Sequence, residues 1–187
     1  EREVIAPLGL RIGSAHQLRE RLGAAIFDER VAPTEVIPWR GGTIRGAVHD
    51  ENAWALSGDR SSGHAGLFGD ARTVVDLGVA VLDALADRRP DWLGPDDLAP
   101  LIRPRPGGSL LAGFDHRSGD SPSSGAHFGE KSFGHLGFTG TSLWIDPDAE
   151  LVGVLLTNRV HPTRETLLIR KARPVVYDAL ASAMLGQ

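Results

Sequence analysis

The sequence predicts an α/β fold in which an antiparallel sheet is flanked by helices. Two apolar segments, residues 141–145 and 151–157, are separated by only five residues, a spacing typical of two strands in an antiparallel hairpin. The second segment is apolar on both faces, so we expect a central strand with helices on each side. Apolar residues at helical spacing over residues 70–85 and 172–184 supply those helices.

Before the hairpin, the sequence alternates helices with loops. We expect a first helix over residues 14–27, where apolar residues recur at helical spacing behind Ser14 as its cap. Residues 30–62 are rich in Gly, Pro and Thr, and their strand-like pieces are too short to make a sheet. This segment therefore predicts an ordered loop region wrapped over a site. The next helix begins near Asp70 or Thr73 and buries one face.

The segment before the hairpin is irregular, whereas the end of the chain is helical. Prolines and glycines interrupt residues 88–129, which predict only a helical turn at 98–102 and a strand at 110–114. A stretch with so little regular structure is usually a functional loop or a flexible lid. The final helix has Pro174 in its first turn and should pack on the hairpin. Its expected buried stripe is Ala172, Val175, Val176, Ala179, Leu180, Ala183 and Met184.

Composition narrows the classes of function. The chain has 187 residues, of which 41% are hydrophobic, enough for one sizeable core. A net charge of −4 argues against a nucleic-acid partner, because phosphate binding needs a basic face. No apolar run approaches the roughly 18 residues of a membrane span. The lack of cysteine excludes disulfides, thiol catalysis and Cys-ligated metal sites. The compartment, whether cytoplasmic or periplasmic and extracellular, stays open.

The most informative segment is residues 134–147, which read GHLGFTGTSLWIDP. Its first eight residues hold three glycines and two threonines, so little side chain is available for burial. The backbone there can approach a ligand closely and present its N–H groups. This composition predicts an active-site strand whose nucleophile lies elsewhere.

This segment and the strand that follows it, LVGVLLTNR at residues 151–159, resemble the third conserved box of the serine β-lactamase-related hydrolases. That superfamily includes class C β-lactamases, penicillin-binding proteins, D,D-carboxypeptidases and family VIII-type esterases. Upstream, VHDENA (48–53) and GHAGLF (63–68) resemble the branch of penicillin-binding protein 4B, and PLGL (7–10) and APTE (32–35) fit in the same order. The resemblance implies a β-lactamase-like α/β/α architecture, with residues 1–187 as the C-terminal part of the domain.

Two boxes of that family have no match in this sequence. The related enzymes carry the nucleophile and its base in a Ser-x-x-Lys box, followed by a Tyr-x-Asn-like box, both before the Pro-Leu-Gly segment. Here no Ser-x-x-Lys occurs, and the only tyrosine, Tyr177, falls in the C-terminal helix. We expect the C-terminal half of a longer hydrolase, with the N-terminal half or a partner chain supplying Ser-x-x-Lys. The alternative is a non-catalytic β-lactamase-like ligand-binding or interaction module.

The resemblance assigns roles around the 134–147 segment. His135 takes a position that is usually Lys or His, where the side chain polarises the site and assists proton transfer. The N–H of Phe138 pairs with the nucleophile's own N–H as an oxyanion hole, where one donor contributes on the order of 3 kcal/mol in the transition state. Gly137 and Thr139 are candidate substrate-binding residues on a strand edge that can hydrogen-bond the substrate.

Each of these assignments has a structural alternative. His135 could simply be a strand-end histidine bonded to backbone, and the glycines could only shape a bulge beside Phe138. Leu136 departs from the family pattern, because the usual threonine offers a hydroxyl to a substrate carboxylate. Its loss shifts the expectation toward a neutral ester or amide substrate, or toward lost activity.

Other candidates lie outside the box. His64 is a candidate substrate contact, whereas core packing is the favoured role of Trp54. Thr163 and Arg164 could touch substrate, although Thr163 and Asn158 could equally cap helices. Neither a metal nor an organic cofactor is expected, since no His-Glu-x-x-His-like spacing occurs. The implied reaction is acyl transfer to serine and hydrolysis of an ester, amide or β-lactam in a small-molecule or peptidoglycan-type substrate.

Overall fold

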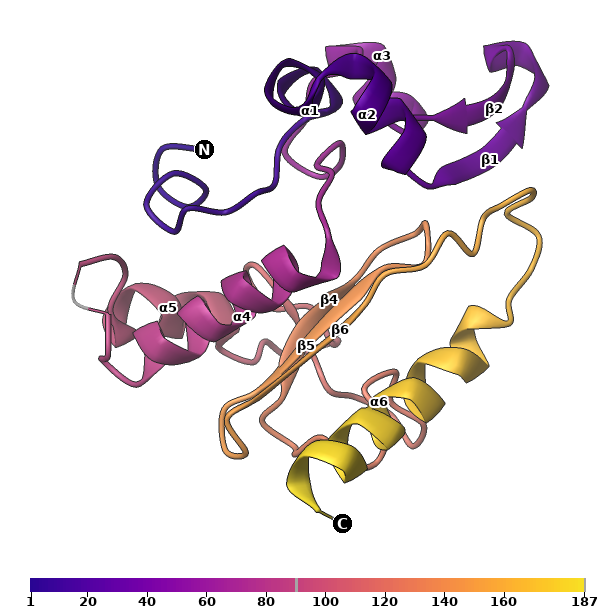
Figure 1. Ribbon diagram of the computed structural model, residues 1–187. Coiled ribbons are helices and arrows are strands. Elements are labelled where there is room, and N and C mark those ends of the chain that lie inside the picture. The colour runs from indigo at the N-terminus through magenta and orange to yellow at the C-terminus, as the bar shows by residue number, and fades with distance from the viewer. Residues whose placement is uncertain (90, 187) are drawn as a thin grey trace.

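A four-stranded antiparallel sheet with helices on both faces forms the centre of the computed structural model, which describes residues 1–89 and 91–186 (Figure 1). The strands follow in the order β3-β4-β5-β6. The α/β class and the β5–β6 hairpin are confirmed, but β6 is the outer strand of the described sheet, so its predicted central position is wrong. The strands are β3 (Asp115–His116), β4 (Phe133–Leu136), β5 (Ser142–Asp146) and β6 (Leu151–Leu155).

Helices α4 (Ala71–Leu85) and α5 (Pro95–Ile102) cover one face of the sheet, and α6 (Ile169–Leu185) covers the other (Figure 1). Phe133 and Ile145 join the α4 and α5 side chains in one core cluster. Trp144 packs with Tyr177 of α6 in a second cluster. Each large apolar side chain buried in this way contributes roughly 1.5–3 kcal/mol. These two layers explain why β6 is apolar on both faces although it lies at an edge.

The borders of α4 and α5 follow local rules, but the next predicted strand is misplaced. Asp70 Oδ1 accepts a hydrogen bond from the Thr73 N–H (2.8 Å), so α4 begins where the sequence predicts. The helical turn predicted at 98–102 is the end of α5, which already begins at Pro95. The strand predicted at 110–114 is wrong: the Leu111 N–H donates to Phe114 O (2.7 Å) in a tight bend, and β3 follows it.

The helix predicted over residues 14–27 is two helices, α1 (Ala15–Leu22) and α2 (Ala24–Arg30). The break is at Gly23, whose φ of +88° lies in a region that glycine tolerates best. Ser14 caps α1 as predicted, because its Oγ accepts from the Gln17 N–H (3.3 Å) while the Gln17 side chain accepts from the Ser14 N–H (2.9 Å).

The segment predicted as loop, residues 30–62, contains regular structure. Strands β1 and β2 form their own two-stranded antiparallel sheet, so the prediction that these pieces are too short to make a sheet alone is wrong. Gly41 and Gly42 both have positive φ and allow the reversal between the strands. The elements here are β1 (Pro33–Ile37), the 3-10 helix η1 (Pro38–Arg40), β2 (Gly42–Arg45) and α3 (Glu51–Ser57).

Helix α6 buries a different face from the predicted one. Its buried residues recur every four positions, and Val175, Val176 and Met184 of the predicted stripe are exposed instead. Pro174 lies in the second turn, not the first, because the helix already begins at Ile169. The buried residues are Ile169, Arg173, Tyr177 and Ala181.

Candidate active site

Residues 137–141 form the tight turn that joins β4 to β5. The Gly137 N–H donates to Thr141 O (2.8 Å), and the Gly140 N–H donates to Gly137 O (3.1 Å). Gly140 has a φ of +108°, and a Cβ at this position would collide with Thr157. Gly137 and Gly140 therefore shape the backbone of this turn, and close approach of a ligand to it stays a prediction.

Side chains from the loop after β6 and from α6 bind four of the five carbonyls of the 137–141 turn. Arg173 Nη2 donates to both Gly137 O (2.9 Å) and Thr141 O (2.9 Å). Arg159 Nε donates to Phe138 O (2.8 Å). The Thr157 hydroxyl donates to Gly140 O (2.8 Å). The carbonyls of the turn are thus fixed on protein donors.

The hydrogen bonds to the carbonyls of the turn also fix the direction of its N–H groups. In a planar trans peptide the C=O and the following N–H point in opposite directions, and the one cis bond among the described residues lies at His161-Pro162. Because Gly137 O faces Arg173, the Phe138 N–H faces away from it. No acceptor within residues 1–89 or 91–186 takes the Phe138 N–H. The turn presents this donor outward, a geometry suited to an anion.

His135 lies on β4, two residues after Phe133, and therefore on the face of the sheet that α4 covers. It is exposed, and its Nδ1 is 3.1 Å from Leu136 O. In the described register β3 pairs only with Phe133 and Gly134, so the edge of β4 is open at His135. The backbone contact matches the strand-end interpretation of His135, and its catalytic role stays a prediction.

A charged cluster lies beside the turn and consists of Glu35 on β1, His49, Glu51 on α3, and Arg164; we call it the Glu35–Arg164 cluster. Arg164 Nε donates to both Glu35 oxygens (2.8 and 2.7 Å), and its Nη2 donates to Glu51 (2.6 Å). The Arg164 hydrogen bonds lower the pKa of Glu35 from its usual 4.5 to about 2, against the opposing effect of burial. Glu35 is therefore ionised at neutral pH, and His49 Nε2, 2.9 Å away, is the donor to it.

The cluster contacts the ring of Phe138. The His49 ring stacks on it with centroids 5.8 Å apart and planes 21° apart. The Arg164 guanidinium lies 5.6 Å from the ring centroid, and the Arg159 guanidinium lies 4.4 Å from it. Such cation–π and stacked pairs each contribute about 0.5–1.5 kcal/mol. Phe138 thus keeps its position although its residue is 58% exposed.

The structure assigns definite partners to two candidates from the loop between β6 and α6. Arg164 belongs to the cluster just described, and the Thr163 hydroxyl accepts from the Glu165 N–H (3.3 Å). Asn158 donates to Pro33 O (2.9 Å), which ties this loop to β1. The alternative that Thr163 and Asn158 cap helices is wrong, because α6 has no side-chain cap. Substrate contact by Thr163 or Arg164 stays a prediction.

His64 lies beside α3. Its Nε2 is 3.1 Å from Asp50 Oδ1, and its Nδ1 is 3.2 Å from the Ser62 hydroxyl. Asp50 caps α3 by accepting from the Ala53 N–H (2.7 Å), and this bond, with help from His64, lowers the pKa of Asp50. Asp50 is therefore a helix cap, and the role of His64 toward substrate stays a prediction.

Trp54 does not pack in the core as predicted. It is 38% exposed, and the Arg40 guanidinium lies 4.2 Å from the centroid of its ring. Trp39 meets it edge-to-face, with centroids 6.1 Å apart. The reason is its position on α3, where the helix turns Ala53 inward and leaves Trp54 at the surface.

Sequence reasoning missed four residues of this site: Glu35, His49 as a contact of Phe138, Arg159 and Arg173. Glu35 and Arg164 are 129 positions apart, so no local pattern links them. A weak signal existed for Arg173 alone, since a charged residue stands four positions before the buried Tyr177 on the same helix face.

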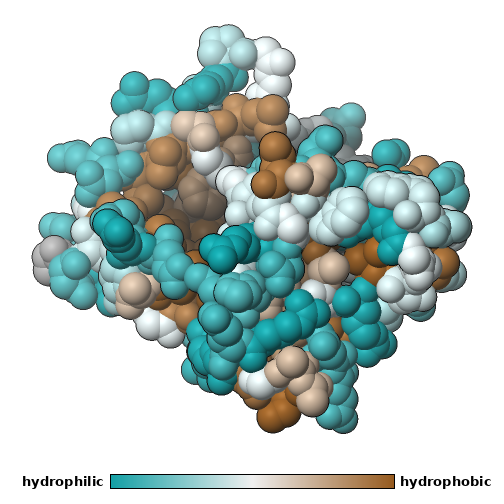
Figure 2. Space-filling model, turned by 90° about the horizontal axis from the view of Figure 1, so that it is seen from above, coloured by the Kyte–Doolittle hydropathy of each residue, from teal (hydrophilic) through white to brown (hydrophobic). Residues whose placement is uncertain are grey.

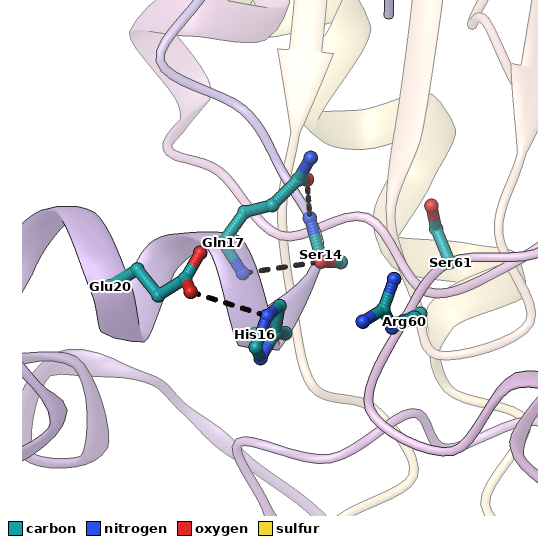
Figure 3. A pocket seen from close by; sticks show the side chains of 6 residues that line it. All are labelled: Ser14, His16, Gln17, Glu20, Arg60 and Ser61. Carbon is teal, nitrogen blue, oxygen red and sulfur yellow. Dashed lines mark hydrogen bonds and ion pairs between the residues drawn. The ribbon is translucent and has the colours of Figure 1, made fainter.

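A separate depression of about 400 Å³ lies between α1 and residues 60–61 (Figure 3). Its polar side chains partner one another: His16 Nε2 is 3.4 Å from Glu20, and Ser14 and Gln17 form the α1 cap. No residue of the 134–147 segment contributes to it. Its lining residues are Ser14, His16, Gln17, Glu20, Arg60 and Ser61.

Within the described parts of the chain, no cluster of three or more metal-ligating side chains is found. None of the helices there has the length and apolar character required to cross a bilayer.

The fold and this turn place the protein in a known class. Simvastatin synthase from Aspergillus terreus superimposes with a TM-score of 0.60 at 16% identity, over 97% of this chain and 49% of that one, which confirms the fold. The sequence model of the Beta-lactamase family matches residues 3–176, and the chain belongs to that family.

Two curated relatives support the same assignment. An N-acetylmuramyl-L-alanine amidase of Bacillus subtilis (strain 168) is 32% identical over 175 residues, covering 86% of this chain and 38% of that protein. A Salmonella agona (strain SL483) protein, named as a candidate D-alanyl-D-alanine carboxypeptidase, is 31% identical over 176 residues, covering 86% and 39%. The chain thus spans less than half the length of these relatives.

Proposed function

We propose that this chain supplies the oxyanion-binding part of an acyl-serine hydrolase site and that Phe138 N–H is one of its two donors. The supporting observation is the capture of the turn's carbonyls, which directs the Phe138 N–H away from Arg173 and leaves it without an acceptor in the described residues. The serine and its lysine come from a Ser-x-x-Lys segment that residues 1–187 do not contain. Residues 1–187 then form the C-terminal part of the catalytic domain.

The proposed reaction has two stages. The serine oxygen attacks the substrate carbonyl carbon, and the carbonyl oxygen becomes an anion bound by Phe138 N–H and by the nucleophile's own N–H. The alcohol or amine then leaves with a proton, and water releases the acyl group from the serine. His135, on the open edge of β4, assists proton transfer. The open edge of β4 receives the substrate backbone, with Gly137 and Thr139 beside it.

The substrate we propose is a neutral ester or amide. Leu136 stands where the family's threonine would bind a carboxylate, and an unpaired buried carboxylate is costly. The amidase name of the Bacillus subtilis relative agrees with amide hydrolysis.

Exposed apolar residues support the proposal that a further segment covers this chain. Leu56 is 81% exposed and Leu110 is 66% exposed, both well above what a buried side chain shows. Figure 2 also shows an apolar hollow ringed by hydrophilic residues on the face that carries the N-terminal elements. Apolar surface of this kind commonly marks an interface. The N-terminal half or a partner chain carrying Ser-x-x-Lys is the occupant we propose.

The first test is covalent labelling of the protein isolated from its native source, with intact-mass analysis. A fluorescent penicillin and a fluorophosphonate probe are used in parallel. We expect a labelled serine in a longer polypeptide or in a co-purifying chain. A lone, unlabelled chain of about this length would contradict the proposal and favour a non-catalytic binding module, the alternative that Leu136 supports.

The second test removes only the proposed donor. Replacing Phe138 by the α-hydroxy acid of the same side chain converts its N–H to an ester oxygen, and kcat should fall about 10²–10³-fold. The same replacement at Thr139, a candidate substrate-binding residue, is the neighbouring-amide comparison and should change KM more than kcat. His135→Gln should lower kcat about 10²-fold while His135→Lys retains most of it. Equal losses at Phe138 and Thr139 would exclude a specific donor.

A further inference from the structure

Arg173 is a buried arginine without a carboxylate partner in the described residues. It is 7% exposed, and within residues 1–89 and 91–186 its hydrogen bonds go to backbone carbonyls and not to a carboxylate. Burial lowers its pKa, but an arginine side chain remains charged in proteins. The groups its Nη2 contacts are two carbonyls of the 137–141 turn, and its Nε has no partner. Burying a charge without an opposite charge is unfavourable in free energy, which indicates that Arg173 has a role beyond packing.

We propose that Arg173 is a positioning residue that polarises the Gly137–Phe138 peptide and thereby strengthens Phe138 N–H as a hydrogen-bond donor. This inference rests on the proposed function for its relevance to the reaction. The peptide unit is conjugated, so a cation bound to its oxygen draws electron density from the nitrogen. The N–H at the other end becomes a better donor, because hydrogen bonds along such a chain reinforce one another.

The turn does not need Arg173 for its shape alone. Both carbonyls that Arg173 contacts already accept an N–H from within the turn: Gly140 donates to Gly137 O, and Gly137 donates to Thr141 O. A neutral second donor to each carbonyl would serve equally well as a structural link. Arg173 contributes a positive charge in addition to its hydrogen bonds. This charge lies on the side of the turn opposite the Phe138 N–H, where it does not contact the substrate.

Arg159 makes the neighbouring peptide a matched control. Arg159 Nε donates to Phe138 O, which belongs to the Phe138–Thr139 peptide. By the same reasoning Arg159 polarises the Thr139 N–H, whereas Arg173 polarises the Phe138 N–H. The two arginines thus act on adjacent N–H groups of one turn, and their effects can be separated.

The test measures base-catalysed hydrogen exchange of individual amides by NMR on the ¹⁵N-labelled chain. A more acidic N–H exchanges faster with hydroxide, so removing the charge at position 173 should slow the exchange of Phe138 about tenfold, equivalent to one pKa unit of the amide. Arg173→citrulline keeps the shape and most donors but removes the charge. It can be made by ligation at position 172 followed by desulfurisation, because the chain has no native cysteine to protect.

Three outcomes decide the matter. Slower exchange at Phe138, with Gly137 and Gly140 unchanged, supports polarisation, and Arg159→Gln should then slow Thr139 rather than Phe138. Unchanged exchange at Phe138 in the citrulline variant overturns it. Faster exchange at Gly137 and Gly140 also overturns it, because those N–H groups close the turn and report its loosening. If Arg173→citrulline fails to fold, Arg173→Lys is the second variant. It retains the charge and should keep most of the exchange rate of the Phe138 amide.

These exchange rates do not depend on acylation. If the protein is never labelled by a serine probe, the proposed function fails while the result at Arg173 still stands. If labelling succeeds but the exchange rate of the Phe138 amide does not change when the charge at position 173 is removed, only this inference fails.

Discussion

Arg164 and Arg173 lie near the same turn, yet their charges have opposite surroundings. Arg164 is held between Glu35 and Glu51 and is partly exposed. Arg173 is buried and contacts only backbone carbonyls. The charge of Arg164 is balanced by two carboxylates, and its contacts join β1 and α3 to the loop before α6. The charge of Arg173 has no carboxylate partner in the described residues and acts on the 137–141 turn. The same residue type thus acts as a cross-link in one place and as a local source of charge in the other.

The largest effect we expect comes from breaking the cross-link. Arg164→Met leaves the buried Glu35 without its main partner, and removal of one member of a buried pair typically costs 3–5 kcal/mol. We expect the free energy of unfolding to fall by about 3 kcal/mol in urea titrations. Arg170→Met, at an exposed position on α6, is the control and should change it by less than about 0.5 kcal/mol. Equal losses of the free energy of unfolding in the two variants would show that the Glu35–Arg164 cluster does not stabilise the contact of β1 and α3 with the loop before α6.

Acid should weaken the same cross-link. The pKa of Glu35 is about 2 in the folded protein against a usual 4.5, so its contribution is complete above pH 4.5 and is lost as the pH falls toward 2. The loss should reach about 3 kcal/mol, from 2.5 pKa units at 1.36 kcal/mol each. Unfolding at a series of pH values from 6 to 2 measures it. The Glu35→Gln variant should lack this slope, and an unchanged slope would assign it to other carboxylates.

Removing the charge of Arg173 should lower the free energy of unfolding less than removing the charge of Arg164. Arg173→Met leaves no charge unpaired, and both of its carbonyls keep a second donor. We expect a loss of about 1–2 kcal/mol in the free energy of unfolding. Urea titrations of the two variants side by side provide the measurement. A loss larger than that of Arg164→Met would mean that Arg173 is mainly a structural link.

The smallest effect should come from removing the ring of Phe138, which contacts Arg164 and belongs to the turn that Arg173 binds. Phe138→Ala removes the stack on His49 and the contacts with two guanidinium groups, but its ring is already largely exposed. We expect a loss of about 1 kcal/mol. In the Arg164→Met background the same substitution should cost less, and a double-mutant cycle measures that coupling. Strict additivity would mean that the cluster does not support Phe138.

Local patterns predicted much of the scaffold. The start of α4 near Asp70, the Ser14 cap and the β5–β6 hairpin each depend on residues within a few positions of one another, and all three are confirmed. The predictions failed at the β1–β2 pair, where two positive-φ glycines close the turn, and at Trp54, which the phase of α3 leaves at the surface. Contacts between segments far apart in the chain, such as that of Glu35 with Arg164, had no local signal at all.

The class of fold, the hairpin and the glycine-rich turn follow from the amino-acid sequence, because periodicity, caps and backbone freedom are properties of short segments. The side chains that surround that turn come instead from segments that only folding brings together. Arg173 is buried against the expectation for a charged residue because the carbonyls it binds belong to another element. Glu35 meets Arg164 across 129 positions because folding brings β1 beside the loop that leads to α6. A side chain's burial depends on its partners, and these partners are adjacent only in space.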